Sequence, residues 1–528
     1  MHKNILILLS VLASFVSSAQ ETWVYFTDKP HATLALQKGE LALSERSIER
    51  RIRQGIWLDE KDVAVSKEYI QQLKSLGFEV VMQSRWMNAV VVKEGPSISL
   101  LDALPFVQKH TPVKKPFSAV AKSTDKTSLL SYGAATAQIQ LVNGDHLHSL
   151  GFSGRGMWIA VLDAGFVGVN TQLVFDSLIS GPRFKDAYNF VIPANTVFQN
   201  GGTHGTAVLS TMAANSPGFF VGTAPHADYS LYSTEDILSE RRVEEYNWLA
   251  AAERADSVGA DVINTSLGYY DFDSDSEDYS FSQMDGNTTV ITKAADWAAS
   301  RGIVVVVSAG NEGSSSWGRI AAPADGDSVL AIGGTLVTGS YVPFSSRGPS
   351  ADGRVKPDVS ATAADAKVVQ SGDQVIGANG TSFSSPQIAG LVACLWQKYP
   401  YLNSEEISTA IRRSAHQFAA PDSLLGYGIP NFGTADIILS NAHYSIIQEV
   451  QLYPNPVTNR SMTIDRKEIL DAQLLLYSLT GEEVFSTKLT GRKSLIQLPD
   501  RISEGIYVLH ILEAKKIFRT KLIVRSLE

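Results

Sequence analysis

Three uninterrupted apolar runs near the middle of the chain constrain its fold more than any other feature of the sequence. Such runs lack the in–out alternation of a half-exposed strand, and they are typical of strands buried on both faces of a parallel sheet. Helical patterns separate and follow them. The runs are WIAVLD (158–163), DVINTSL (261–267) and IVVVVSAG (303–310), and the helical patterns cover residues 204–215, 243–258, 291–301 and 382–398. This alternation predicts an α/β domain with a doubly wound, mostly parallel sheet and helices on both faces.

The residues before this region predict a smaller domain of a different kind. Residues 20–120 mix short strands with helices, so we expect a small α+β domain. A strongly basic helix is expected over Ser44–Arg53, a second helix begins where Ser66 can cap it, and a third is expected over Ile98–Leu104. The stretch from 111 to 131 is rich in Lys, Ser and Pro and has little periodicity. It predicts an exposed linker, where proteases cut most easily.

The residues after the α/β region predict a third domain. Past Asn441, short alternating segments separated by turns are typical of a small β-sandwich. We therefore expect the α/β domain over residues 125–443 and the sandwich over residues 446–528. The formal charge of −9 argues against nucleic acid or an anionic membrane as the main partner. The single cysteine, Cys394, excludes an intrachain disulfide, and its apolar helical setting favours a buried structural thiol over a nucleophile.

The N-terminus predicts export. His2 and Lys3 precede an apolar run over residues 5–16, which small residues follow up to Ala19. This arrangement is typical of a signal peptide over residues 1–19. A membrane anchor is the alternative, but the run is shorter than the roughly 17 residues that span a bilayer. No later segment is long and apolar enough to cross a membrane, so we expect no transmembrane segment once the signal is removed.

Four side chains stand where peptide hydrolysis by a hydroxyl needs them. That chemistry requires a nucleophile, a base that takes its proton and a carboxylate that orients the base. Asp163 ends the first apolar strand, at the carboxyl edge where open α/β sheets place their sites. His204 follows two glycines at the start of one helix, and Ser382 follows Gly380 at the start of another. The free N–H groups of that helix favour an oxyanion beside Ser382, and Asn311 can add a side-chain amide donor.

Each of these residues alone has a simpler interpretation. An aspartate at a strand end is commonly a cap or turn residue, and a serine before a helix is commonly its N-cap. A lone histidine is usually an ordinary surface or core residue. The surrounding motifs are what favour the catalytic interpretation.

At these motifs the sequence resembles the subtilisin family of serine proteases. IAVLDAGF, THGT and GTSFSSP are similar to the aspartate, histidine and serine motifs of that family, and AGNEG is similar to its oxyanion segment. The order Asp, His, Ser differs from that of chymotrypsin-like enzymes and α/β-hydrolases. The resemblance implies that Asp163 orients, His204 is the general base and Ser382 the nucleophile. It also implies that Asn311 and the Ser382 backbone N–H stabilise the oxyanion.

The resemblance further implies how substrate binds. NTSLG looks like the strand that pairs with the substrate backbone, so Ser266, Leu267 and Gly268 are expected to bind substrate, together with Ala309 and Gly310. The segment 317–323 is expected near the primary specificity pocket, and that pocket is expected to prefer apolar P1 residues. Catalysis of this type requires no cofactor and no catalytic metal.

Two departures from the family pattern concern neighbours of the triad. Ala207 stands where the family often has a second histidine, and the aspartate motif ends in AGF, with Ala164 and Phe166, where TGI is common. These changes alter packing and remove no catalytic group.

The flanking domains also resemble known modules. Residues 20–120 resemble the propeptides of exported subtilases, which assist folding and block the cleft, and we expect self-cleavage between His110 and Ser131. An accessory domain that stays attached is the alternative. LYPNPV (452–457) and the final KLIVRS look like the C-terminal sorting domain of type IX secretion substrates, with a substrate-binding β-module as the alternative.

The expected function is therefore that of a secreted or cell-surface serine endopeptidase that hydrolyses proteins through an acyl-enzyme intermediate. Its expected partners are protein and peptide substrates, its own propeptide as inhibitor and the type IX secretion machinery. A catalytically silent binding fold and a dedicated processing enzyme with one target are the alternatives. The acidic stretch from Asp271 to Asp278 is a candidate site for a structural Ca²⁺, although a solvated loop is favoured because the stretch lacks the EF-hand glycine and glutamate.

Overall fold

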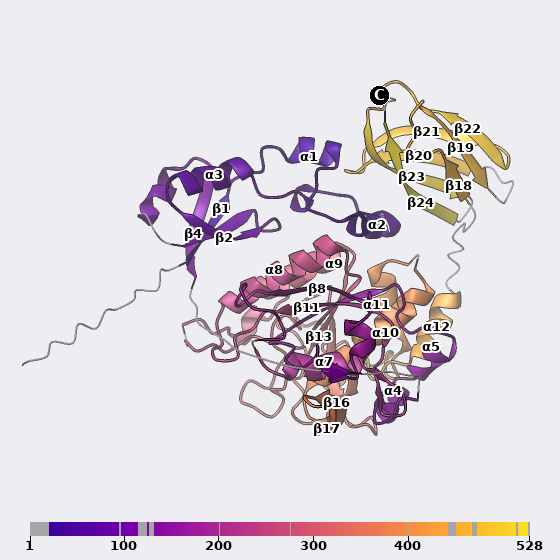
Figure 1. Ribbon diagram of the computed structural model, residues 1–528. Coiled ribbons are helices and arrows are strands. Elements are labelled where there is room, and N and C mark those ends of the chain that lie inside the picture. Colours follow the sequence, from indigo (N-terminus) through magenta and orange to yellow (C-terminus); the bar gives the residue numbers. More distant parts are fainter. Residues whose placement is uncertain are drawn as a thin grey trace, which may run out of the picture.

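The computed structural model places a large α/β body below two smaller ones, the N-terminal domain and the C-terminal sandwich (Figure 1). The described residues are 21–93, 97–113, 124–125, 131–199, 201–274, 276–400, 402–441, 450–466, 472–513 and 516–525. The expected signal peptide lies outside these residues, as does most of the expected linker from 111 to 131. None of the helices in the described part of the chain has the length and apolarity to span a bilayer.

A parallel sheet forms the centre of the α/β body. Within the described residues its strand order is β15-β14-β13-β12-β6-β11-β8, and each neighbouring pair is parallel. The strands are β6 (Trp158–Asp163), β8 (Phe184–Asn189), β11 (Asp228–Ser233), β12 (Val262–Thr265), β13 (Val304–Ser308), β14 (Leu330–Thr335) and β15 (Val359–Thr362). The three predicted apolar strands are β6, β12 and β13, and they are adjacent. The predicted doubly wound parallel sheet is confirmed.

Helices cover both faces of this sheet because its central strands alternate their side chains between two cores. Ile159 and Val161 of β6 face one core, whereas Ala160 and Leu162 face the other. The first core contains α7 and α10, and the second contains α8 and α9. The helices are α4 (Thr136–Leu141), α5 (Asp145–Ser149), α6 (Asp176–Ile179), α7 (His204–Ala213), α8 (Val243–Val258), α9 (Val290–Ser300), α10 (Thr381–Lys398), α11 (Ser404–Ser414) and α12 (Phe432–Asn441).

Short elements complete the α/β body. They are the pairs β5 (Thr124–Asp125) with β7 (Gln172–Leu173), β9 (Asn215–Ser216) with β10 (Phe220–Val221) and β16 (Ala366–Gln370) with β17 (Gln374–Ala378), and the 3-10 turn η3 (Phe281–Gln283). Cys394 on α10 is fully buried, as expected for a structural thiol.

The N-terminal domain contains an antiparallel sheet of order β2-β3-β1-β4. A helical segment lies between β1 and β2 in the chain. Its elements are β1 (Glu21–Phe26), α1 (Ala32–Lys38), α2 (Glu45–Gln54), η1 (Glu60–Asp62), α3 (Lys67–Ser75), β2 (Glu79–Ser84), β3 (Ala89–Lys93), η2 (Ile98–Ala103) and β4 (Val107–Val113). Ser44 caps α2 and Ser66 caps α3 through their side chains, as the sequence predicts. The helix expected over Ile98–Leu104 is instead a 3-10 helix, and Leu101 is its only buried side chain, so it lacks the broad apolar face that stabilises an α-helix.

The C-terminal domain is the predicted β-sandwich. Sheets of order β18-β19-β22 and β21-β20-β23-β24 enclose one apolar core. The strands are β18 (Val450–Tyr453), β19 (Ser461–Arg466), β20 (Ala472–Ser478), β21 (Glu483–Leu489), β22 (Lys493–Gln497), β23 (Gly505–Glu513) and β24 (Lys516–Val524). The sequence of β19, SMTIDR, is largely polar on its outer face.

Candidate active site

The predicted carboxylate and imidazole meet at the carboxyl edge of the central sheet. Asp163 is the last residue of β6 and is fully buried. Its Oδ1 accepts hydrogen bonds from the Ala164 N–H at 2.8 Å and from His204 Nδ1 at 2.7 Å. This contact sets the tautomer of the imidazole, since Nδ1 carries the shared proton and Nε2 is left as the basic nitrogen.

The histidine comes close to the strand because a glycine follows it. His204 is the first residue of α7. A Cβ on Gly205 would lie 2.5 Å from the Gly165 carbonyl oxygen and 3.0 Å from Asp163 Cβ, so no larger residue fits between α7 and β6. The His204 side chain is still 37% exposed. The imidazole is therefore anchored on one side and accessible on the other.

The pKa of His204 lies above its ordinary value. Burial alone lowers this pKa, but the charge of Asp163 and its hydrogen bond outweigh burial. A general base must be neutral to accept a proton. As the pH falls, His204 is therefore protonated sooner than an ordinary histidine. Any activity that depends on neutral His204 should begin to decline at a correspondingly higher pH.

Ser382 lies in the first turn of α10, next to the histidine. Gly380 precedes this helix with φ 148° and ψ 142°, a conformation that is accessible essentially to glycine only. The Ser382 hydroxyl is nearly buried and donates to the Ser266 carbonyl at 3.3 Å. The His204 and Phe383 rings are 5.8 Å apart, which brings the start of α10 against the imidazole. No hydrogen bond joins Ser382 Oγ to His204 in this conformation, although such bonds commonly tighten only when substrate is bound.

Asn311 is tied to the same helix N-terminus. It follows β13, and its Oδ1 accepts from the Thr381 N–H at 2.8 Å and from Thr381 Oγ1 at 3.1 Å. Asn311 is exposed, and no hydrogen bond within the described residues uses its Nδ2. The amide donor is thus oriented beside Ser382 and available to a ligand.

The predicted substrate-binding residues border this group. Ser266 follows β12, and its Oγ donates to the Ser382 carbonyl at 2.8 Å. Leu267 and Gly268 continue from it toward solvent. Ala309 and Gly310 follow β13, and the Gly310 N–H donates to Thr381 Oγ1 at 3.1 Å.

The 317–323 segment lies beside the continuation of this strand. Tyr269 and Ala322 pair as an antiparallel bridge, with N–H to carbonyl distances of 2.8 and 3.2 Å. The Trp317 ring stacks on Tyr270 with centroids 4.5 Å apart, and it meets Phe281 edge-on. These aromatic rings give this side of the site an apolar wall.

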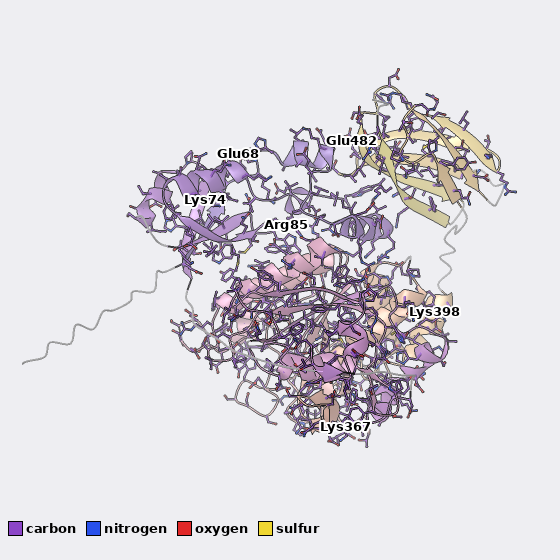
Figure 2. All side chains as sticks on the ribbon, in the orientation of Figure 1. Glu68, Lys74, Arg85, Lys367, Lys398 and Glu482 are labelled. Atoms are coloured by element: carbon purple, nitrogen blue, oxygen red, sulfur yellow. The ribbon has the colours of Figure 1, made fainter. Side chains whose placement is uncertain are left out.

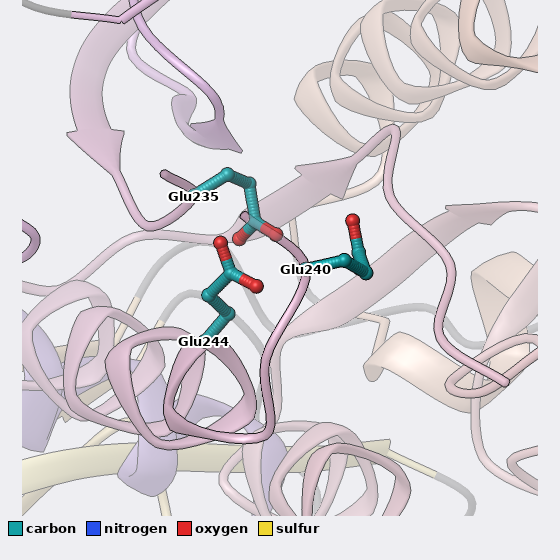
Figure 3. A group of neighbouring side chains, drawn as sticks. All are labelled: Glu235, Glu240 and Glu244. Carbon is teal, nitrogen blue, oxygen red and sulfur yellow. The ribbon is translucent and has the colours of Figure 1, made fainter. Parts of the chain in front are cut away.

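Three glutamates near the triad were missed by the sequence analysis. Glu235, Glu240 and Glu244 point toward one another, and their carboxylate oxygens lie within 4.8 Å (Figure 3). All three fall within ten residues of sequence, but nothing in the pattern shows that the loop between β11 and α8 folds back so that they meet. Glu235 and Glu244 are buried, whereas Glu240 is exposed.

Burial decides the protonation of this cluster. It raises the pKa of Glu235 well above its usual value, against the hydrogen bonds from Thr234 Oγ1 and the Tyr269 hydroxyl. Burial and the neighbouring Glu235 carboxyl raise the pKa of Glu244 in the same way. The Glu240 side chain is partly exposed, but the loss of water around its carboxylate and the charges of Asp273 and Asp271 raise its pKa to about 7. Protonation of the buried members accounts for their close approach without a cation.

Two carboxylates of the acidic stretch, those of Asp273 and Asp278, have protein partners. Asp278 Oδ1 accepts from the Phe272 N–H at 2.9 Å, and Asp273 lies 3.7 Å from Arg241. These contacts favour the interpretation of this stretch as an ordinary solvated loop.

Comparison with known proteins agrees with this architecture in all three parts of the chain. The model of the subtilase family matches residues 154–428, that of the peptidase S8 propeptide domain of Bacteroidota matches residues 21–128, and that of a secretion system C-terminal sorting domain matches residues 451–525. We refer to the N-terminal domain and the sandwich as the propeptide and the sorting domain from here on.

Individual relatives match the α/β body. Subtilisin E of Bacillus subtilis is 31% identical over 281 residues, which is 52% of this chain and 65% of that protein. Subtilisin DY of Bacillus licheniformis is 30% identical over 280 residues, covering 52% of this chain and 90% of that protein. Among solved structures, MycP1 from Mycobacterium smegmatis has 20% identity and a TM-score of 0.45, over 61% of this chain and 89% of that one. By its matching family model and its similarity to these two subtilisins, the chain belongs to the subtilase family of serine peptidases.

Proposed function

We propose that this subtilase is a secreted serine endopeptidase that hydrolyses proteins through an acyl-enzyme intermediate. Asp163, His204 and Ser382 are its triad. The observation that carries the proposal is the 2.7 Å hydrogen bond from His204 Nδ1 to buried Asp163, which leaves Nε2 as a base beside the start of α10. Labelling of Ser382 by a fluorophosphonate probe separates this function from a silent binding fold, because only an activated serine reacts.

The reaction follows from these positions. His204 Nε2 takes the proton of Ser382 Oγ, once that hydroxyl turns from the Ser266 carbonyl, and Oγ attacks the peptide carbonyl carbon. Asp163 stabilises the imidazolium that forms. The imidazolium then gives its proton to the leaving amine, and water repeats the sequence on the acyl-enzyme to regenerate Ser382.

The Ser382 backbone N–H and Asn311 Nδ2 stabilise the oxyanion in this scheme. Asn311→Ala should lower kcat by about 10²–10³-fold with little change in KM, because the donor acts on charge that develops in the transition state. The magnitude is transferred from subtilisin. The measurement is steady-state hydrolysis of a chromogenic peptide by the purified variant. An unchanged kcat would exclude Asn311 from the oxyanion site.

Glu235 lies close to the base but is protonated near neutral pH, because burial raises its pKa to about 8. Glu235→Gln therefore exchanges one neutral side chain for another, and the acid limb of kcat/KM should stay in place. The pH profile of kcat/KM for the parent enzyme and the variant checks this. A limb that moves to lower pH would show that Glu235 is ionised where His204 titrates.

Substrate pairs with residues 266–268 on one side and with Ala309 and Gly310 on the other. The aromatic wall at Trp317 suits apolar side chains, and the reaction needs no cofactor. A structural Ca²⁺ would have to use carboxylates outside the triad, such as those of the loop from Asp271 to Asp278. Digestion of a peptide library by the secreted enzyme separates a broad endopeptidase from a dedicated processing enzyme.

The flanking domains direct maturation and export. Residues 1–19 are the signal peptide, residues 20–120 the inhibitory propeptide, residues 125–443 the catalytic domain and residues 446–528 the sorting domain. The chain cuts itself between His110 and Ser131, and the type IX machinery carries it across the outer membrane.

Deleting residues 446–528 should trap active protease in the periplasm, because the catalytic domain no longer has the segment that the machinery binds. Cell fractionation followed by an activity assay on each fraction measures this. Undiminished activity in the medium would contradict the sorting role and leave the substrate-binding module as the alternative.

A further inference from the structure

One helix of the propeptide contacts both other domains. On one face of α2, Arg46, Arg50 and Arg53 pair with carboxylates of the catalytic domain. Gln54 continues this face, donating to the Gly302 carbonyl at 2.7 Å and accepting from the Ser404 N–H at 2.9 Å. These positions are three to four residues apart, so they share one side of the helix.

The other face of α2 meets the sorting domain. Glu45 pairs with Lys521 of β24, and Glu49 lies 3.7 Å from the same ammonium. The Arg53 carbonyl accepts from Arg519, also on β24, at 3.5 Å. In Figure 1, α2 accordingly lies between the α/β body and the sandwich.

The residues around α2 add an apolar interface with the sandwich. Leu36, Ile48, Ile52 and Leu58 of the propeptide form one buried cluster with side chains of the sorting domain. We call the sandwich side of this cluster the docking face, and it consists of Tyr477, Leu479, Ile506 and Val508. Figure 2 shows the labelled Glu482 of the same edge beside α1.

Close backbone and ring contacts show that this interface is complementary in shape. The Leu58 N–H donates to the Leu479 carbonyl at 2.8 Å. The Trp57 ring lies against Gly481, where a Cβ would be 2.9 Å from it, and its centroid is 5.1 Å from that of Tyr477. Trp57 also stacks on His510 at 5.9 Å.

The docking face is separate from the core of the sandwich. Leu479 and Val508 are each 4% exposed, yet they belong to the cluster shared with the propeptide and not to the cluster between the two sheets. Their burial therefore depends on the propeptide. A sorting domain that folds by itself would expose them as an apolar patch.

We propose that residues 32–62 of the propeptide are a two-sided clamp that holds the sorting domain on the zymogen, so that loss of the propeptide frees the sorting domain and uncovers its docking face. Removal of the propeptide during maturation then exposes the docking face at the same time. The proposal extends the maturation described above but does not depend on catalysis, because the clamp is a binding arrangement.

A distance measurement on the inactive full chain tests the clamp. In a Ser382→Ala background, labels at Leu150→Cys and Thr490→Cys report the separation of the catalytic and sorting domains, and buried Cys394 does not react. The parent should give one narrow distance distribution. Leu479→Asp with Val508→Asp should broaden it, because both charges would be buried against the clamp. Leu495→Asp is the matched control, since Leu495 is 74% exposed, and it should leave the distribution narrow.

A second variant addresses the other side of the clamp. Asp256→Ala weakens the hold of the catalytic domain on α2. A foreign protease site inserted between residues 114 and 123 allows the propeptide of this variant to be cut off and removed by gel filtration. The distance distribution should then broaden.

Two outcomes overturn the proposal: a distribution that is already broad in the parent, or one that stays narrow after the docking face is charged or the propeptide is removed. The melting transition of the sandwich in each variant excludes unfolding as the cause. Loss of catalysis leaves all these readouts unchanged, so a failure of the proposed function is distinguishable from a failure of the clamp.

Discussion

Replacing Ser382 with alanine should lower turnover by about six orders of magnitude. The substitution removes the only atom that forms the acyl-enzyme and leaves His204 and Asp163 with no nucleophile to activate. The magnitude is transferred from subtilisin, in which the triad acts as a unit. The remaining rate should reflect substrate binding and the oxyanion donors alone. Hydrolysis of casein and of a chromogenic peptide by purified enzyme measures the loss.

Ser384→Ala is the matched control for this experiment. Ser384 is fully buried two residues further along α10, and its hydroxyl only donates to the Thr381 carbonyl at 3.0 Å. This variant should keep near-normal activity and react with a fluorophosphonate, whereas Ser382→Ala should not react. Near-normal hydrolysis by Ser382→Ala would refute the assignment of the nucleophile.

The Ser382→Ala variant also tests whether the enzyme removes its own propeptide. Ser382→Ala should keep its propeptide and begin near Gln20, whereas active enzyme should begin between residues 111 and 131. Adding a trace of active enzyme to the variant distinguishes cleavage within one chain from cleavage between chains. A mature N-terminus at Gln20 in active enzyme would show that the propeptide stays attached.

Replacing Asp256 with alanine should weaken propeptide binding by about 3–5 kcal/mol, or at least about 10²-fold, because it leaves buried guanidinium groups without their shared carboxylate. Asp256 lies on α8 and is fully buried. Its Oδ1 pairs with Arg50, and its Oδ2 lies 2.8 Å from Arg51 and 2.5 Å from Arg85. Burial opposes the charge of Asp256, but the three guanidinium groups hold its pKa far below the usual value.

The activity of the mature enzyme should not change in the Asp256→Ala variant. All three guanidinium partners belong to the propeptide, and Figure 2 shows Arg85 at the edge of that domain which faces the catalytic domain. The measurement is the dissociation constant of the propeptide after cutting an inserted protease site in the Ser382→Ala chain. Exposed Asp327→Ala is the control. Equal affinity in both variants would show that this ion-pair network contributes nothing to propeptide binding.

Local patterns were sufficient to predict the architecture. β6 (Trp158–Asp163) and α8 (Val243–Val258) have the predicted bounds, and the apolar runs of β12 and β13 lie within the predicted ranges. These three strands are nearly continuous apolar runs because they are buried on both faces. The other four strands of the sheet were not predicted. The sequences of β11 (DYSLYS) and β15 (VSAT) contain polar residues although both strands are buried, and β14 (LAIGGT) contains two glycines. The edge strand β8 (FKDAYN) is mostly half-buried and has a mixed sequence.

The motifs around Asp163, His204 and Ser382 were visible for a similar reason. Gly205 and Gly380 occupy positions where a larger residue does not fit or the backbone conformation requires glycine. The geometry of the site therefore restricts the residues next to it, and this makes the motifs recognisable. The catalytic roles of these residues, and of Asn311, stay predictions until the variants are measured.

The sequence by itself determined the three most apolar strands, the helices beside them, the fold class of each domain and the motifs that follow those strands, because each depends on neighbouring residues and their periodicity. Only the tertiary structure decided that Glu235, Glu240 and Glu244 meet beside the histidine. It alone decided that Asp256 binds three arginines more than 170 residues away along the chain and that α2 joins three domains. Such contacts depend on how distant surfaces fit together, and an arginine or leucine that pairs across a domain boundary has the same local sequence as one that faces water.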